Sequence, residues 1–347
     1  MTGSSSSPSP PDTPRGDRPV LVVGLPRSGT TWTAQLLAHA PGWRSVLEPD
    51  NEKTSVVALG AKRGLGRFPA LSPGDGAEAY RGMWAWAFAG SPVGLGLRIG
   101  DRLFRSASSR QREAAASGHV VPRLRLASAA ATAATRTGRA ASRSGVSDPP
   151  LGSGPRVIVK SVHAPLAVEW VADNFDIDVL VVLRHPANVL ASWLELDLPD
   201  RDRGLDHRAA VQERYVRRWN LPAPGTGPLE RVVWQLGLLT VSLEEAAARH
   251  PRWLVRVHEE LCVDPPAEFR RLFADLGLEW SDVVDDALEA GDRPGQGFTL
   301  QRRAVEAPDA WRSRLGPTEL ASLRRVLGAF PLQHWSADDM PGDACAG

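Results

Sequence analysis

The chain has little cysteine and no long apolar run. Its 347 residues include only Cys262 and Cys345, too few for a disulfide framework or a four-cysteine zinc site. The longest charge-free apolar stretch, residues 82–97, is interrupted by five glycines and prolines and is shorter than the ~18 residues expected of a membrane-spanning helix. The N-terminus has no apolar signal core, so we expect a cytoplasmic protein.

An excess of charge of one sign is also missing. The 41 Lys and Arg residues nearly balance the 40 Asp and Glu residues, leaving a formal net charge of +1. This balance excludes a uniformly basic nucleic-acid binder, so no nucleic-acid partner is expected. The Ser/Pro-rich residues 1–17 predict a disordered tail, because they offer almost no apolar surface to bury. A single domain is predicted over residues 18–340.

Short apolar runs are the main structural signal. Residues 19–23, 156–160 and 178–183 read as strands buried on both faces, and a fourth strand is expected at 253–257. Strands alternating with helices predict an α/β fold, in which a P-loop-like central parallel sheet is flanked by helices and followed by a helical C-terminal part. The helices expected after the first three strands cover residues 31–39, 165–174 and 186–193.

The turn after the first strand carries an anion-binding pattern. The sequence GLPRSGTTW lies between a buried strand and a helix, where backbone N–H groups and the helix dipole attract an anion. Gly24 and Gly29 have the spacing of the nucleoside-triphosphate loop G-x-x-x-x-G-K-[ST], but Thr30 stands where that loop has lysine. The cation of the turn is instead Arg27.

The ends of the second and third predicted strands carry cations. Nucleoside triphosphatases usually have a strand ending in Asp that helps to hold Mg²⁺, whereas these strands end in Lys160 and Arg184. We therefore expect no metal. Pro186 suits a first helical turn, which lets Arg184 and Ser192 converge on a second phosphate. Two anion sites indicate a nucleotide phosphorylated at two places.

At these residues the chain resembles the sulfotransferases that use 3′-phosphoadenosine 5′-phosphosulfate (PAPS). LPRSGTTW resembles their 5′-phosphosulfate loop, and Arg184 with Ser192 resembles their 3′-phosphate pair. The sequence HEEL at 258–261, followed by Asp264-Pro265, resembles an E-D-L…D-P motif of the same family. The similarity spans roughly residues 18–280. The family's C-terminal R-K-G-x-x-G motif is not recognisable.

The resemblance implies a P-loop-type α/β fold, PAPS as sulfuryl donor and a hydroxyl group as acceptor. It also implies in-line transfer with a general base and without a metal. By position, the nucleotide-binding residues would be Arg27, Ser28, Gly29, Thr30, Thr31 and Trp32 for the 5′-phosphosulfate, Arg184 and Ser192 for the 3′-phosphate, and Arg302 or Arg303 as a further contact.

Two residues are candidates for the base. Glu48 follows the first predicted helix, and carbohydrate-modifying members of the family have a base Glu in a similar place. His163 lies three residues after Lys160, which resembles the K-T-H of the small-molecule branch with one extra residue between Lys and His. We favour Glu48, because the insertion turns the imidazole away. Lys160 is expected to neutralise the sulfonate or the leaving phosphate.

The acceptor is less determined. Trp84 and Trp86 are either ordinary core or the wall of a cleft for a glycan, glycolipid or natural product. An Arg/Ala/Ser-rich insertion is predicted at 98–150, and its residues 98–144 hold ten Arg and two acidic residues. One alternative is a mobile insertion whose arginine content follows the overall composition, since the chain has only three lysines and uses arginine almost everywhere. The other is a cationic lid or acceptor surface. Peripheral membrane contact fits the pattern, and the oligomeric state is not readable.

Two other functions stay open at this stage. An ATP-dependent small-molecule kinase would need a loop lysine and a carboxylate for Mg²⁺, neither of which can be placed. A non-catalytic nucleotide-binding protein would not need Glu48, Lys160 and His163.

Overall fold

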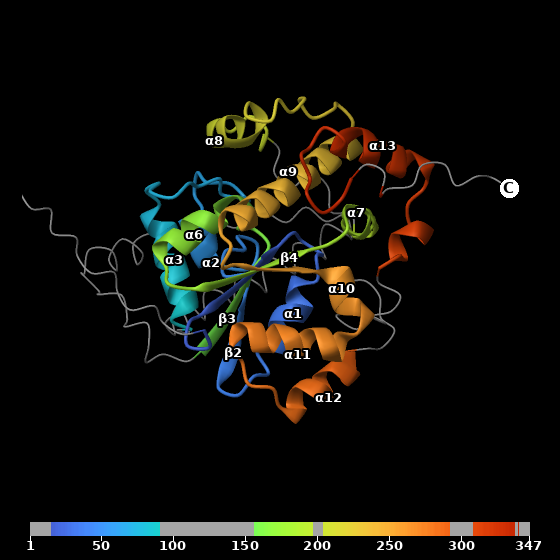
Figure 1. Cartoon of the computed structure of the whole chain (residues 1–347). Helices are drawn as coiled ribbons and strands as arrows, with labels where there is room; N and C mark the ends of the chain where they lie inside the picture. The colour runs from blue at the N-terminus through green and yellow to red at the C-terminus, as the bar shows by residue number, and fades with distance from the viewer. Residues whose placement is uncertain (1–14, 91–155, 197–203, 292–307, 337–338, 340–347) are drawn as a thin grey trace, which may run out of the picture.

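A five-stranded parallel sheet forms the centre of the molecule (Figure 1). The computed structural model describes residues 15–90, 156–196, 204–291, 308–336 and 339. The strand order is β2-β3-β1-β4-β5, and every neighbouring pair is parallel. The strands are β1 (Val20–Gly24), β2 (Trp43–Leu47), β3 (Arg156–Ser161), β4 (Asp178–Leu183) and β5 (Leu254–Val257).

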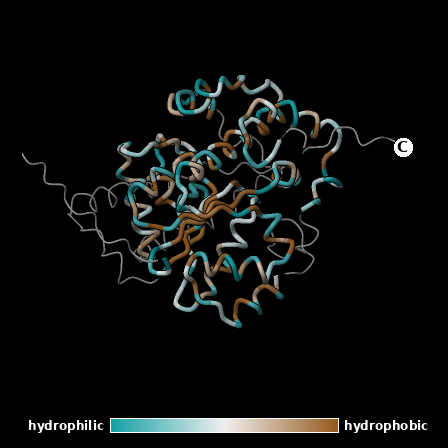
Figure 2. Tube along the Cα trace, in the orientation of Figure 1, coloured by the Kyte–Doolittle hydropathy of each residue, from teal (hydrophilic) through white to brown (hydrophobic). Residues whose placement is uncertain are grey.

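Helices cover both faces of this sheet (Figure 1), and its strands are strongly hydrophobic (Figure 2). Alternate residues of β1 serve the two faces: Leu21 and Val23 join the core under α3, α6, α7, α9 and α13, while Val20 and Val22 join the core under α1, α11 and α12. The α-helices are α1 (Thr30–Leu37), α2 (Val56–Ala61), α3 (Glu78–Phe88), α6 (Val168–Asn174), α7 (Pro186–Glu195), α8 (Ala209–Val211), α9 (Pro228–Arg249), α10 (His258–Val263), α11 (Pro265–Leu276), α12 (Asp282–Gly291) and α13 (Pro317–Leu327). Single turns of other helix types are η1 (Pro165–Ala167), the π-helical η2 (Gln212–Val216) and η4 (Ala310–Ser313).

The predicted α/β fold class is confirmed: the sheet is parallel, and the described part after β4 is mostly helical. Four predicted strands correspond to β1, β3, β4 and β5. One strand, β2, was missed. Its sequence WRSVL lacks a continuous apolar run, because β2 is an edge strand in which only Trp43 is buried and the other residues are partly or fully exposed. Glu48 follows the first helix as expected, but β2 lies between that helix and Glu48.

Two further predictions concern the start of the domain at residue 18 and the insertion at 98–150. Arg15 donates hydrogen bonds to the backbone oxygens of Asp275 and Arg252, so contacts with the fold begin before the boundary expected at residue 18. The predicted insertion at 98–150 lies outside the described residues. Among the helices that the structure describes, none is long and apolar enough to cross a membrane.

The carboxyl ends of the parallel strands lie along one edge of the sheet and bring distant loops together. After β1 the chain continues towards β2 and β3, whereas after β4 it leads to β5 on the opposite side. In open α/β sheets, ligands bind where neighbouring strands lead away in opposite directions. The register places Gly24 beside Val182, so the loop after β1 lies next to the end of β4.

Candidate functional site

The loop after β1 ends in an uncapped helix. Gly29 is the N-cap of α1 and has a left-handed backbone with φ of +89°. No side chain caps the helix, so the N–H groups of its first turn have no intrahelical acceptor. Arg27 also has a positive φ, +72°, which is uncommon for a residue with a side chain. The loop therefore directs backbone donors and the positive end of the helix dipole to one point.

Close packing makes both glycines of the loop necessary. A Cβ atom on Gly24 would lie 2.5 Å from the Ser28 hydroxyl oxygen, and also 2.5 Å from the backbone oxygen of Val182. A Cβ atom on Gly29 would lie 2.2 Å from Nδ1 of His258, at the start of α10. The glycine spacing thus reflects contacts with β4 and α10, as well as backbone freedom.

The two predicted anion sites are adjacent. Nε of Arg27 donates to the hydroxyl of Ser192 at 3.0 Å, and Nη1 of Arg184 donates to the backbone oxygen of Arg27 at 2.7 Å. Trp193 on α7 also donates, through its indole N–H, to the backbone oxygen of Pro26 at 2.8 Å. The loop, the end of β4 and α7 therefore form one unit that carries two guanidinium groups.

Glu259 lies close to Arg184 and is itself held by hydrogen bonds from neighbouring residues. Glu259 accepts from the backbone N–H of His185 at 3.2 Å and from the side chain of Asn188 at 2.8 Å. One oxygen of Glu259 lies 3.8 Å from Nε of Arg184. Asp264, further along the same motif, caps α11 by accepting from the N–H of Ala267. The motif HEEL…DP thus connects β5 to the end of β4, a role that sequence reasoning did not foresee.

Three buried polar atoms at this unit have no hydrogen-bond partner in the described part of the chain: Oγ of Ser28, Nε of Arg184 and Nδ1 of His258. Burial and then the charge of Arg184 lower the pKa of His258 to about 3, so its imidazole is neutral. Leaving buried polar groups unpaired is costly. Unpaired groups beside a helix N-terminus and two guanidinium groups suit a ligand with anionic oxygens.

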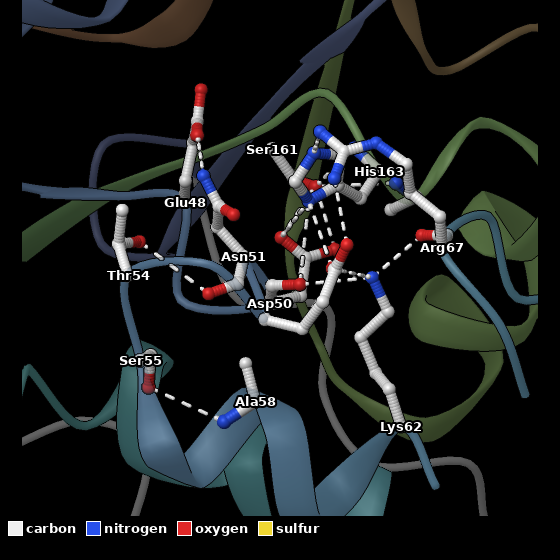
Figure 3. Close-up of polar contacts among 12 residues, drawn as sticks. Glu48, Asp50, Asn51, Thr54, Ser55, Ala58, Lys62, Arg67, Ser161 and His163 are labelled. Carbon is white, nitrogen blue, oxygen red and sulfur yellow. Dashed lines mark hydrogen bonds and ion pairs between the residues drawn. The ribbon is translucent and has the colours of Figure 1, made fainter. Parts of the chain in front are cut away.

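Glu48 and Lys160 meet at the ends of β2 and β3 (Figure 3 shows Glu48 among its neighbours). Leu47 lies beside Lys160 in the sheet, so the next residue, Glu48, reaches the lysine. Nζ of Lys160 lies 2.5 Å from Oε1 of Glu48, and the amide of Asn51 donates to Oε2 at 2.6 Å. Glu48 has φ of +51° and its side chain is 28% exposed, against 3% for Lys160.

The carboxylate of Glu48 is held in its ionised form. Burial alone would raise the pKa of Glu48, but the charge and hydrogen bond of Lys160, followed by the hydrogen bond of Asn51 and the charge of Arg67, together lower it below its ordinary value. An ionised, partly exposed carboxylate is the form that a proton acceptor requires.

His163, the other candidate base, is fully enclosed. Its side chain is 0% exposed, and Nε2 lies 2.7 Å from a guanidinium nitrogen of Arg67. A guanidinium only donates, so Nε2 accepts and Nδ1 carries the proton towards the backbone oxygen of Asp50, 3.3 Å away. Burial lowers the pKa of His163 well below its ordinary range, and the charges of Arg67 and Lys62 lower it further. Both ring nitrogens are therefore engaged within the fold.

Sequence reasoning missed the polar cluster behind Glu48 (Figure 3). Lys62 donates to Glu52 at 2.8 Å and to the backbone oxygen of Asp50 at 3.0 Å. Arg67 donates to the other oxygen of Glu52 at 2.6 Å. The rarity of lysine could have indicated this cluster, because two of the three lysines in the chain, Lys62 and Lys160, are buried here. No group of three or more His, Cys, Asp or Glu residues in the described ranges is arranged to hold a metal.

The two tryptophans predicted for acceptor contact differ in burial. Trp84 is fully buried and stacks on Phe88 with ring centroids 5.5 Å apart, so its burial favours the core alternative over a cleft wall. Trp86 is partly exposed on the same helix, α3. At helical spacing the two tryptophans lie on different faces, so they do not form one wall. Arg302 and Arg303 lie outside the described residues.

Three solved structures illustrate what the whole chain is similar to. The sulfotransferase domain of the Synechococcus PCC 7002 olefin synthase has a TM-score of 0.45 and 13% identity, covering 91% of this chain and 94% of that one. The sulfotransferase domain of the curacin biosynthetic pathway has a TM-score of 0.44 and 11% identity, covering 91% and 99%. Sulfotransferase STF9 from Mycobacterium avium has a TM-score of 0.38 and 15% identity, covering 93% and 79%.

No protein-family model matches the chain, and the comparison with curated proteins gave no match.

Proposed function

We propose that this protein is a PAPS-dependent sulfotransferase that moves a sulfuryl group to a hydroxyl acceptor without a metal. The observation that carries the proposal is the pairing of two sites on one edge of the sheet. Arg27 donates to Ser192, and Arg184 donates to the backbone of Arg27, so the residues proposed for the two anion sites are adjacent. The ionised Glu48, paired with Lys160, lies at the ends of strands on the same edge.

The nucleotide would be held by backbone and cations together. The N–H groups at the start of α1, with Arg27 and the hydroxyls of residues 28, 30 and 31, suit the 5′-phosphosulfate. Arg184 and Ser192 suit the 3′-phosphate, and the unpaired Nδ1 of His258, next to Gly29, would be a further donor in the tautomer that carries its proton there. Arg302 or Arg303 remains a proposed contact. Guanidinium and amide donors bind anionic oxygens strongly, which supports a ligand with phosphate groups at two positions.

Glu48 is the proposed base. PAPS supplies the sulfuryl group, whose sulfur forms a bond to the acceptor oxygen as its bond to the 5′-phosphate oxygen breaks. Glu48 takes the proton of the acceptor hydroxyl, which its ionised state allows. Lys160, in contact with Glu48, would neutralise negative charge that develops on the sulfonate or the leaving phosphate. The enclosure of His163 argues against it as the base.

The acceptor class is the least constrained part of the proposal. A glycan, a glycolipid or a natural product with a free hydroxyl suits a site that combines a carboxylate base with cations. We propose a single catalytic domain acting in the cytoplasm, with Trp86 as the remaining aromatic candidate for acceptor contact, since it is partly exposed.

Thermal unfolding with added nucleotides tests the proposal. A ligand at about 100 times its Kd stabilises the folded state by about 2.7 kcal/mol. We expect adenosine 3′,5′-bisphosphate to raise Tm without added metal, and AMP to have a much smaller effect because it lacks the 3′-phosphate. Arg184→Ala should abolish the shift, whereas Arg271→Ala, on the exposed face of α11, should preserve it. Stabilisation by ATP with Mg²⁺ in place of the bisphosphate would reject the sulfotransferase proposal and favour a kinase.

A further inference from the structure

The backbone at Glu48 is held in an uncommon conformation. Among the described residues other than glycine, only Arg27, Glu48 and Asn220 have positive φ angles. Such conformations persist only where surrounding contacts hold them, and they are concentrated at functional sites. At Glu48 the N–H donates to the backbone oxygen of Lys160 at 2.7 Å, and its own carbonyl accepts from the N–H of Asn51 at 3.1 Å. The turn therefore presents the carboxylate in a fixed direction.

Both ends of the Asn51 side-chain amide make hydrogen bonds, and Figure 3 shows the one with Glu48. Its oxygen accepts from the backbone N–H of Lys53 at 3.1 Å, which requires the amide nitrogen to be the atom that faces Glu48. That nitrogen donates to Oε2 of Glu48 at 2.6 Å. The carbonyl of Asn51 also accepts from the N–H groups of Thr54 and Ser55. Asn51 is therefore a rigid donor whose orientation is set by its own loop.

The two oxygens of Glu48 have different environments. Oε1 faces the positive charge of Lys160, whereas Oε2 faces the neutral amide of Asn51. A proton added at Oε1 would lie against an ammonium group, which disfavours it. At Oε2 a lone pair remains beside the amide hydrogen bond. The proton of an acceptor hydroxyl therefore has its better place at Oε2.

We propose that Asn51 is a positioning residue, which aims the carboxylate of Glu48 so that Oε2 takes the acceptor proton. The inference rests on the proposed function. Asn51 itself touches neither acceptor nor nucleotide in this scheme. It acts through Glu48, by holding one carboxylate orientation and by stabilising the ionised form.

Two readouts test this role with substitutions at Asn51. The first is the rate of PAPS breakdown with water as the acceptor, measured against pH, which needs no identified substrate. The second is the pKa of Glu48 from carboxyl carbon NMR, assigned by comparison with Glu48→Gln. Asn51→Ala should lower the rate by about 10- to 100-fold through misplacement of the base. Asn51→Asp keeps the shape and brings two carboxylates together, which should raise the pKa of Glu48 further than Asn51→Ala does.

A control variant changes the same loop without removing a hydrogen bond to Asn51. Thr54→Ser, in the same loop, keeps the hydroxyl that donates to the carbonyl of Asn51 at 3.4 Å and removes only a methyl group. It should leave the rate, the pH profile and the pKa of Glu48 unchanged. The bisphosphate should stabilise Asn51→Ala and wild type equally, which verifies that the variant is folded.

A double variant separates this inference from the proposed function. In the Glu48→Gln background, Asn51→Ala should cause no further loss of rate, because Asn51 acts only through Glu48. An Asn51→Ala variant with the wild-type rate and Glu48 pKa would overturn the positioning role while the sulfotransferase proposal stands. A failure of the bisphosphate to bind wild type would instead reject the proposed function.

Discussion

At the scale of single residues, the candidate chemistry coincides with uncommon backbone conformations. Arg27 and Glu48 are two of the three described non-glycine residues with positive φ, and they lie on the loops that follow β1 and β2. Each is held by the end of a neighbouring strand: Arg184 donates to the backbone of Arg27, and the backbone of Lys160 accepts from that of Glu48. The sheet thus holds these two candidate site residues in backbone conformations that an isolated loop would not keep.

Glu48→Gln tests the base directly. It should slow sulfuryl transfer from PAPS by about 10²–10⁴-fold, the usual contribution of a general base. Stabilisation by the bisphosphate should persist, because the nucleotide loop is separate from Glu48. The measurement is release of the bisphosphate from PAPS, with hydroxyl acceptors and with water.

The pH dependence of the wild-type rate follows from the same group. Because the folded pKa of Glu48 lies below its ordinary value, the base-dependent rate should stay level through neutral pH and fall only as pH drops through that lowered pKa. A rate that already falls at neutral pH would contradict the assignment of Glu48.

At this scale the sequence indicated the loop after β1 more fully than the surroundings of Glu48. The residues of the loop are contiguous, so their spacing alone indicated an anion site between a strand and a helix. Glu48 was named, but Asn51 was not, because its donation to Glu48 depends on the turn after an unpredicted strand. The enclosure of His163 depends on Arg67, 96 residues away.

At the scale of elements, the loop after β1 depends on the helix that follows β5. The imidazole of His258, the first residue of α10, lies where a side chain on Gly29 would project. The pairing order of the strands brings these two segments together from opposite ends of the chain. Gly29 is therefore required both by its own φ and by the neighbouring helix.

Gly29→Ala and Gly42→Ala form a matched pair that separates these two requirements. Both glycines have positive φ, +89° and +79°, but a Cβ atom at Gly42 would meet no atom within 4 Å. Gly42→Ala should cost about 1–2 kcal/mol of unfolding free energy, the penalty of the left-handed backbone alone. Gly29→Ala should cost more, and should also abolish binding of the bisphosphate.

Chemical denaturation measures both costs. Adding His258→Ala to Gly29→Ala should recover part of the loss by removing the clashing ring. Equal costs for the two single variants would show that His258 yields without penalty, contrary to the contact described.

At the scale of the whole molecule, the end of the described chain is tied back to its middle. Glu244 on α9 is buried, and it accepts hydrogen bonds from the backbone N–H groups of Gln333 and His334 and from Nδ1 of His334 at 2.9 Å. The hydrogen bond with Glu244 raises the pKa of His334 above its ordinary value. The contact therefore couples overall stability to pH.

The sign of this coupling is fixed by the raised pKa. Protonated His334 is favoured in the folded state, so its contribution is fully present below the unfolded pKa of about 6.5 and is lost as pH rises through the higher folded pKa. Wild type should exceed His334→Gln in unfolding free energy at pH 5.5, and this difference should shrink as pH rises through the folded pKa of His334. Urea unfolding across that range measures it, and a difference independent of pH would contradict the titration of His334.

By itself, the sequence determined the α/β class, four of the five described strands and the glycine loop between the first strand and the first helix. These features depend on apolar runs, glycines and helix starts that lie close together in the chain, so local patterns are sufficient to indicate them. The tertiary structure alone decided the edge strand β2, the pairing of Glu48 with Lys160 and the enclosure of His163. Parallel strand pairing joins residues more than 100 positions apart, and burial then sets which charges are paired and which nitrogens stay accessible.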